Sequence, residues 1–482
     1  MENRATSRQL AHSGAIDGLR TELGDWAVGP GPLFRQLARA IASGVERGTL
    51  PRGGALPSER ALAAALSVSR GTAVAAYDLL VAEGLVQRRA GSGTSVAGSG
   101  SFELPSGREG SALVHRLVDH SAGRSGVVDL SISVLREAAG LPDVAVRTED
   151  LRALRPDTGY SPWGLPELRD AIARHVTGWG LPTTAHEVVV TTGAQQAISA
   201  AAACWIRPGD TVVVDDPSYP GAVSTFLQAG ARLIGLPVGP GGVRPEDLQG
   251  ALASHPALVY LQSTLHSPTG TVLGEARRRE LAAVIARSRV PLVEDLALAD
   301  LAWREAPPPI ASFCLGASVV VVGSLSKLYW GGLRVGWARA DEPLALRIAR
   351  VKATHDLGSS VLGQAFAARL LAAAPPADMA RRRQGALAER YELLAAALRA
   401  QLPRWSWEEP EGGMSLWVRL PSPTAEPFAE VALRHGVAVA TAPALSTSGR
   451  HADRLRLSFS GAPEELAEGV FRLAAAWQAH VG

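Results

Sequence analysis

Five short apolar runs, separated by segments long enough to hold helices, constrain the fold of this chain more than any other feature. The runs are EVVVTT (187–192), TVVVDD (211–216), ALVYLQ (257–262), PLVED (291–295) and SVVVVG (318–323). Strands that are buried on both faces read as continuous apolar runs, and helical crossovers make neighbouring strands parallel. The pattern therefore predicts an α/β fold with a mostly parallel sheet from residue 127 onward.

Ligands of open α/β sheets bind beyond the carboxyl ends of the strands, so the residues that follow each run are candidate site residues. A glycine turn opens a helix after the first run, an aromatic ring follows the second, and a carboxylate ends the fourth. Serine, lysine and arginine follow the fifth run. These candidates are Gly193, Ala194, Gln195, Tyr219, Asp295, Ser324, Lys327 and Arg334.

Taken singly, each of these features also fits a structural role, such as a turn or a cap. Together they supply a phosphate cradle, a stacking ring, an acid and a primary amine. Helix N–H groups with serine and arginine donors bind a phosphate. A carboxylate keeps a pyridinium nitrogen protonated, and a lysine forms a Schiff base with an aldehyde. This set meets the requirements of pyridoxal 5′-phosphate.

Lysine is almost absent from the chain. Of its 48 basic residues only Lys327 and Lys352 are lysines. Arginine stays protonated and cannot act as a nucleophilic amine, whereas lysine can. We therefore expect Lys327 to carry covalent chemistry, and Lys352, which lies in a helical segment, to face solvent.

The N-terminal part is basic. Residues 31–98 hold eight arginines and four acidic residues, a net charge of +4, which leaves −2 for the rest of the chain. Such an asymmetry indicates nucleic-acid binding, although a solvated charged surface would also explain it. Leu33, Leu37, Ile41 and Val45 recur every four residues and predict a helix whose apolar face includes all four.

Two further helices are expected in this part, capped by Ser58 and Ser69 and joined by a short turn, as in a helix-turn-helix. Residues 85–96 then predict a hairpin that forms a wing. Arg70 and Thr72 lie at the start of the third helix, where side chains reach base edges, and Arg88 and Arg89 precede the wing tip. A small protein-binding helical module is the alternative interpretation.

The segment 33–96, with LPSER, VSRGT and RRAGSGTSVA, closely resembles the GntR-type winged helix. The resemblance implies that Arg60 contacts phosphate and that Ser69, Arg70 and Thr72 contact DNA from the recognition helix. Some members of that family have an arginine where Val74 stands, so one of their base contacts is expected to be missing.

Residues 127–482 resemble the fold-type I (class I and II) aminotransferases through GYSPWGLPELRDAIA, TTGAQQAI, DDPSYPG, HSPTG, SLSK and LRLSFS. The resemblance implies that Lys327 forms the Schiff base, that Asp295 pairs with the pyridine nitrogen and that Tyr219 stacks on the ring. It assigns the phosphate to the groups around Gly193, Ala194, Gln195, Ser324 and Arg334. It assigns a substrate α-carboxylate to Arg456, for which a structural ion pair is the alternative.

Two departures from the aminotransferase pattern concern the phenolate oxygen of the cofactor. Ser267, which we keep among the expected cofactor contacts, stands where an asparagine is usual. Ala297 and Leu298 stand where a tyrosine is usual. We expect cofactor binding to survive these changes and transamination to be slow. His266, beside this motif, is expected to be a solvated loop histidine.

A GntR-type winged helix followed by an aminotransferase-like body is similar to the domain order of the MocR subfamily of bacterial regulators. The expected fold class is an α+β winged helix-turn-helix head joined to an α/β fold-type I body, which comprises a mostly parallel large-domain sheet and a small C-terminal domain. The expected parts are a tail (1–27), the DNA-binding domain (28–98), a linker (99–126) and the body (127–482).

This architecture implies a transcription factor that binds a double-stranded DNA operator and senses an amino compound or pyridoxal 5′-phosphate itself. It also implies a head-to-tail homodimer. The alternatives are a functional aminotransferase with a vestigial head, and a regulator whose body has lost the cofactor. Without an apolar run of 18 residues or a signal-peptide core, and with only Cys204 and Cys314, we expect a cytoplasmic protein without a metal site.

Overall fold

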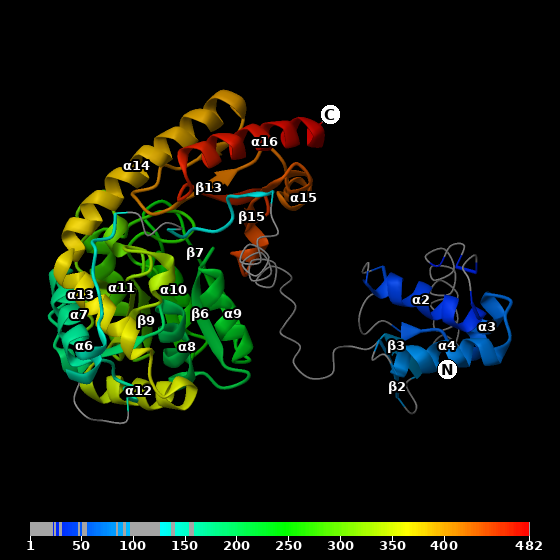
Figure 1. Cartoon of the computed structure of the whole chain (residues 1–482), viewed down its shortest axis with the longest axis horizontal. Coiled ribbons are helices and arrows are strands. Elements are labelled where there is room, and N and C mark those ends of the chain that lie inside the picture. The colour runs from blue at the N-terminus through cyan, green and yellow to red at the C-terminus, as the bar shows by residue number, and fades with distance from the viewer. Residues whose placement is uncertain are drawn as a thin grey trace. The chain divides into compact units, whose positions relative to one another are not determined.

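The computed structural model describes residues 23, 26–27, 31–46, 49–50, 55–82, 85–89, 93–96, 126–135, 140–153 and 159–481. The chain divides into two compact units, Met1–Leu104 and Pro105–Gly482 (Figure 1). Most of the expected tail and all of the expected linker except residue 126 lie outside the described residues.

The first unit has the helices and strands of a winged helix. Its helices are α2 (Leu33–Glu46), α3 (Glu59–Ala65) and α4 (Arg70–Ala82). Its strands are β1 (Ala55–Leu56), β2 (Val86–Arg89) and β3 (Gly93–Val96), which form an antiparallel sheet in the order β1-β3-β2. The wing strands β2 and β3 and both predicted caps are present: Ser58 Oγ accepts from Ala61 N at 3.2 Å, and Ser69 Oγ accepts from Thr72 N at 3.0 Å.

The structure of this unit differs from the prediction at Leu33 and at one additional strand. Leu37, Ile41 and Val45 are buried, but Leu33 is 46% exposed. Residues four apart advance by about 40° around a helix, so Leu33 lies well away from the centre of the buried face. The strand β1 was not predicted, because two residues show no alternation; its pairing with β3 appears only in the folded unit.

The second unit is built on a seven-stranded sheet in the order β5-β11-β10-β9-β8-β6-β7. The five apolar runs form β5 (Val188–Thr191), β6 (Thr211–Asp216), β8 (Leu258–Leu261), β9 (Leu292–Asp295) and β10 (Val319–Ser324). The two further strands are β7 (Arg232–Pro237) and β11 (Gly336–Arg339). Only β11 is antiparallel to its neighbours, so the predicted mostly parallel α/β sheet is confirmed.

Helices cover both faces of this sheet (Figure 1). One face packs on α8 (Ala194–Trp205), α9 (Pro220–Gln228) and α12 (Glu342–Asp356) through Ile198, Phe226 and Ile348. The other face packs on α7 (Pro166–Gly178), α10 (Pro245–Leu252), α11 (Glu275–Ser288) and α13 (Val361–Ala373). Because both faces are covered, the central strands consist largely of apolar residues, with acidic side chains near the carboxyl ends of β6 and β9, which explains the apolar runs in the sequence.

A smaller antiparallel sheet follows, in the order β12-β13-β16-β15. Its strands are β12 (Ser406–Trp407), β13 (Ser415–Arg419), β15 (Ala440–Thr441) and β16 (Arg454–Ser458). The helices of this region are α14 (Pro376–Gln401), α15 (Glu426–Arg434) and α16 (Pro463–Val481). Near the start of the unit, β4 (Val128–Asp129) pairs in parallel with β14 (Val437–Ala438), and the short helix α6 (Thr148–Ala153) follows. None of the helices described is long and apolar enough to cross a membrane.

Candidate functional site

A cavity of about 450 Å³ lies at the carboxyl ends of the sheet strands in the second unit. Its lining includes nine of the ten site residues expected in the body: Ala194, Gln195, Tyr219, Ser267, Asp295, Ser324, Lys327, Arg334 and Arg456. The tenth, Gly193, is the residue before α8. The fold gathers residues 194–334 of this set because the parallel strands end at one edge of the large sheet, and β16 of the smaller sheet adds Arg456.

Lys327 lies on the turn that follows β10. Its Nζ donates a hydrogen bond of 2.6 Å to the backbone carbonyl of Ser133. Burial, together with the positive charges of Arg456 and Arg334, lowers the pKa of Lys327 to about 8, while Asp295 acts in the opposite direction. The amine therefore loses its proton much more readily than an exposed lysine, as a nucleophilic amine requires.

Asp295 ends β9 and is buried. Its Oδ2 accepts from the hydroxyl of Tyr260 at 2.6 Å, and its Oδ1 accepts from the backbone N–H of Ala297 at 2.9 Å. Burial raises the pKa of Asp295, and these hydrogen bonds and Lys327 act against that rise. Tyr260 donates to this carboxylate but was not among the expected site residues. It lies inside an apolar run, so the sequence indicates a core residue there.

The region between β5, α8 and the turn after β10 can bind an anion. Gly193 has φ +77°, a backbone conformation that favours glycine, and a Cβ there would lie 2.7 Å from Nη2 of Arg334. Arg334 donates from Nη2 to the carbonyl of Thr192 at 3.0 Å. Nearby, Ser324 Oγ accepts from the backbone N–H of Ser326, and the Ser326 hydroxyl is buried without a hydrogen-bond partner. Free donors beside a helix N-terminus suit a phosphate group.

Arg456 on β16 brings a second positive charge to the cavity. Its guanidinium is buried, and Nη2 donates to the carbonyl of Ser131. Its Nε is buried without a partner. Burial lowers the pKa of Arg456 to about 10, although Tyr219 and Asp129 act to raise it. An unsatisfied buried guanidinium N–H is costly, and a ligand carboxylate would satisfy it.

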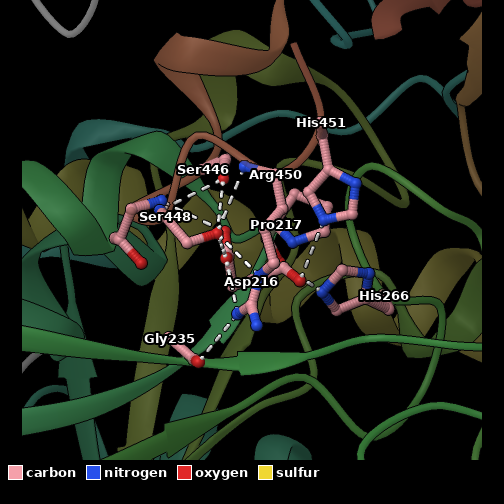
Figure 2. Close-up of polar contacts among 9 residues, drawn as sticks. Asp216, Pro217, Gly235, His266, Ser446, Ser448, Arg450 and His451 are labelled. Atoms are coloured by element: carbon pink, nitrogen blue, oxygen red, sulfur yellow. Dashed lines mark hydrogen bonds and ion pairs between the residues drawn. The ribbon is translucent and has the colours of Figure 1, made fainter. Parts of the chain in front are cut away.

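The loop that carries Tyr219 is tied to the C-terminal region through Asp216, the last residue of β6 (Figure 2). The buried Asp216 carboxylate accepts from Thr447 N at 3.1 Å, from the Ser448 hydroxyl and from Arg450 Nη2 at 3.2 Å. Burial raises the pKa of Asp216, but the hydrogen bond from the Ser446 side chain, together with those from Ser448, Arg450 and Thr447, outweighs it and holds the pKa below its usual value. Residues 447–450 therefore anchor the start of the loop that carries Tyr219.

His266 is buried, so the expectation of a solvated loop histidine was wrong. Its Nε2 lies 2.9 Å from the carbonyl of Pro217 (Figure 2). Its Nδ1 lies 2.8 Å from the hydroxyl of Thr269. Burial lowers the pKa of His266 to about 4, which makes the ring neutral near pH 7. A neutral ring that donates to Pro217 and accepts from Thr269 satisfies both nitrogens.

Lys352 is also buried, and the expectation that it faces solvent was wrong. It lies on the side of α12 that packs on the sheet. Its Nζ lies 2.9 and 3.0 Å from the two carboxylate oxygens of Asp356, one helical turn further on. This pairing allows the charge to be buried. Lys352 does not line the cavity.

The residues at the two departures from the aminotransferase pattern all line the cavity: Ser267, Ala297 and Leu298. The backbone N–H of Ser267 donates to Oε1 of Gln262 at 2.7 Å, and Nε2 of Gln262 lies 3.5 Å from the Tyr260 hydroxyl. Gln262 thus brings a side-chain amide to the same wall. It was missed because it is the last residue of the apolar run 257–262, where it reads as part of the strand, and it matches no motif.

In the first unit, the expected DNA-contacting residues lie on α3, at the start of α4 and on β2. Arg70 is the first residue of α4 and is exposed, and Arg60 is exposed on α3. The Ser69 hydroxyl caps the helix and lies 2.9 Å from the Thr72 hydroxyl. Arg88 and Arg89 are on β2, and their side chains lie outside what the structure describes. Val74 is half-buried.

Two family models match the chain and together cover most of it. Residues 125–473 match the model of class I and II aminotransferases. Residues 33–96 match the model of bacterial regulatory proteins of the gntR family.

The curated relatives include transcriptional regulators and an aminotransferase. The chain is 28% identical over 469 residues to the uncharacterised HTH-type transcriptional regulator YdfD of Bacillus subtilis, covering 92% of this chain and 95% of the relative. It is 29% identical over 417 residues to the probable rhizopine catabolism regulatory protein MocR of Rhizobium meliloti, covering 80% and 82%. It is 30% identical over 326 residues to 2-aminoadipate transaminase of Thermus thermophilus, covering 66% and 79%.

The backbone fold of this chain is also similar to that of a solved aminotransferase structure. The α-aminoadipate aminotransferase LysN of Thermus thermophilus, in complex with N-(5′-phosphopyridoxyl)-L-leucine, matches with a TM-score of 0.69 and 26% identity. The match covers 79% of this chain and 98% of LysN.

Proposed function

Since the chain belongs to the class I and II aminotransferase family and has the gntR-type domain of MocR-like transcriptional regulators, we propose that it is a DNA-binding regulator that responds to an amino compound through pyridoxal 5′-phosphate. The cavity around Lys327 carries this proposal. It combines a lysine of lowered pKa, a buried carboxylate and an anion-binding region.

The donor set fits pyridoxal 5′-phosphate. The unpartnered Ser326 hydroxyl, Arg334 and the N-terminus of α8 would hold the phosphate, and Asp295 would pair with the pyridine nitrogen. Tyr219 would lie against the ring. When bound, the cofactor supplies an aldehyde that reacts reversibly with primary amines. The neutral amine of Lys327 is the group in this chain suited to that reaction.

The remaining residues of the cavity determine what else binds. Arg456 has a free guanidinium N–H to pair with a carboxylate, so the effector we propose bears one. The Asp216 network holds the Tyr219 loop against residues 447–450 of the C-terminal region. A ligand that prefers one arrangement of these two segments would shift the protein between states, which is the requirement for an effector.

In the first unit, Arg70 and Thr72 would read base edges from the start of α4, while Arg60, Arg88 and Arg89 would neutralise phosphates. The operator is double-stranded DNA. We propose a head-to-tail homodimer, because two recognition helices placed by a dimer bind a palindromic operator better than one. We place its action in the cytoplasm, where the DNA is.

A functional aminotransferase with a vestigial head is the second candidate, supported by the presence of Lys327, Asp295 and Arg456 in one cavity. Ser267, Ala297 and Leu298 argue against efficient turnover, because alanine and leucine carry no polar side-chain group and serine has a shorter side chain than the usual asparagine.

Footprinting of the full-length protein on its own upstream region, with and without pyridoxal 5′-phosphate, tests the proposal. We expect protection of a discrete site whose extent or affinity changes when the cofactor is added. Protection that is identical in both conditions would contradict cofactor sensing, and the absence of any discrete site would favour the aminotransferase.

A further inference from the structure

The charges that line the cavity are few. Of the described residues in its wall, four carry a formal charge: Asp295, Lys327, Arg334 and Arg456. In the proposed function Arg334 serves the phosphate, Asp295 and Lys327 serve the ring and its aldehyde, and Arg456 serves one carboxylate. Within this described lining, no charged side chain remains to pair with a second charge on the effector.

Most of the accessible surface of the wall is apolar, and its other polar groups belong to uncharged serine, threonine, glutamine and tyrosine side chains. Ile132 and Val134 come from the segment 131–135, which passes over the site. Leu265, Leu298 and Met414 come from three other parts of the chain. Burying a charged side chain against such a wall without a partner is strongly unfavourable, whereas burying an apolar one is favourable.

The segment 131–135 is fixed in place over the cavity. The carbonyl of Ser133 accepts from Lys327, and the carbonyl of Leu135 accepts from the N–H of Gly331 at 3.2 Å. A Cβ on Gly331 would overlap Cγ2 of Val134, so this valine packs directly on the turn after β10. The apolar side chains of this segment are therefore part of a preformed wall.

We infer that the effector is an amino acid with a single carboxylate and an uncharged, mainly apolar side chain. The inference rests on the proposed function and names the ligand class of the same cavity. Arg456 selects the carboxylate, Lys327 marks the position of the amino group, and the wall formed by Ile132, Val134, Leu265, Leu298 and Met414 selects the side chain.

Titration of the full-length protein, loaded with pyridoxal 5′-phosphate, with matched amino acids tests this inference. Norleucine is compared with lysine, which adds an ammonium to the same chain, and norvaline is compared with glutamate. The change in the visible absorption of the bound cofactor gives an apparent Kd. We expect each apolar ligand to bind at least tenfold more tightly than its charged counterpart. Equal or tighter binding of lysine or glutamate would overturn the inference.

The variant Leu298→Arg adds a positive charge to the wall and should lower the norvaline-to-glutamate preference at least tenfold. Leu315→Arg is the matched control, because Leu315 is 89% exposed and outside the cavity lining; its preference should equal that of the unmodified protein. Ile132→Arg repeats the test from the half-buried segment 131–135, with circular dichroism to verify folding. An unchanged preference in folded Leu298→Arg and Ile132→Arg would overturn the assignment of this wall.

Failure of the proposed function and failure of the ligand class give different results. A protein that shows no visible absorption after incubation with the cofactor contradicts the proposed function, and with it this inference. A protein that binds the cofactor and DNA but prefers charged amino acids leaves the proposed function intact and contradicts only the ligand class.

Discussion

The ammonium of Lys327 donates a hydrogen bond of 2.6 Å to the backbone carbonyl of Ser133, 194 residues earlier in the chain. This bond ties the segment over the cavity to the residue that we expect to react. A ligand that takes the Lys327 amine removes the donor and leaves the Ser133 carbonyl to find another partner. Occupation of the cavity is thus coupled to the segment 131–135.

Replacing Lys327 by arginine should abolish covalent attachment of the cofactor and leave the protein folded, because arginine keeps the charge but is not a nucleophilic amine. Borohydride reduction followed by peptide mass spectrometry should place the cofactor on Lys327 in the unmodified protein and on no lysine of Lys327→Arg. Lys352, buried and paired with Asp356, is the internal control. Cofactor found on Lys352 would show that the site assignment is wrong.

The rate at which the cofactor-free protein takes up pyridoxal 5′-phosphate should depend on pH. Burial and the neighbouring arginines lower the pKa of Lys327 to about 8, and only the neutral amine reacts. Attachment should therefore slow as the pH falls below about 8 and become constant above it, as measured by stopped-flow absorbance. In Arg456→Gln the loss of a positive charge should move the midpoint to higher pH. A rate that keeps rising through pH 10 would indicate an ordinary lysine.

Arg70→Ala should weaken operator binding by about 1–3 kcal/mol if Arg70 makes a bidentate base contact, and should affect random DNA much less. Arg89→Ala should weaken binding to all sequences alike and reduce the salt dependence. Arg39→Ala, on the exposed side of α2, serves as the control. Fluorescence anisotropy on both DNAs at several salt concentrations distinguishes these outcomes. Equal losses on operator and random DNA would remove Arg70 from the base-reading role.

A fragment of residues 28–98 should bind the operator weakly and show no response to the cofactor. The first unit has its own buried core, with Leu37, Ile41 and Tyr77 fully buried, so it should fold alone. It lacks the second unit through which we expect two heads to be paired. Affinity equal to that of the full-length protein would contradict dimerisation through the second unit.

Transamination by the unmodified protein should fall well below the rates of about 1–10³ per second that are typical of enzymes. Restoring the usual groups in Ser267→Asn with Leu298→Tyr should raise the single-turnover rate about tenfold, which corresponds to one hydrogen bond of about 1.4 kcal/mol. Leu315→Tyr, on the surface, should have no effect. Typical enzymatic rates in the unmodified protein would favour the aminotransferase over the regulator.

Much of the fold follows from local sequence. The apolar runs predicted five of the seven strands of the large sheet, because a strand covered on both faces consists largely of apolar residues. The caps at Ser58 and Ser69 follow from bonds that span three residues. Because parallel strands end at a common edge, the strand order in the sequence also predicted that Asp295 and Lys327 lie at one edge of the sheet.

Only the tertiary structure decided the environment of the polar residues. His266 and Lys352 read as solvated residues, yet one is enclosed by Pro217 and Thr269 and the other is buried against the sheet beside Asp356. Tyr260 and Gln262 read as core and become the supports of Asp295 and Ser267.

The physical reason is the range of the interactions. Strand and helix formation depends on patterns that repeat within a few residues, so the sequence alone determines them. The effect of Arg456 on the pKa of Lys327, and the bonds of Lys327 to Ser133 and of Arg456 to Ser131, join segments more than 120 residues apart that meet only after the chain has folded. Burial and partners of this kind decide the chemistry of the cavity, and they exist only in the folded chain.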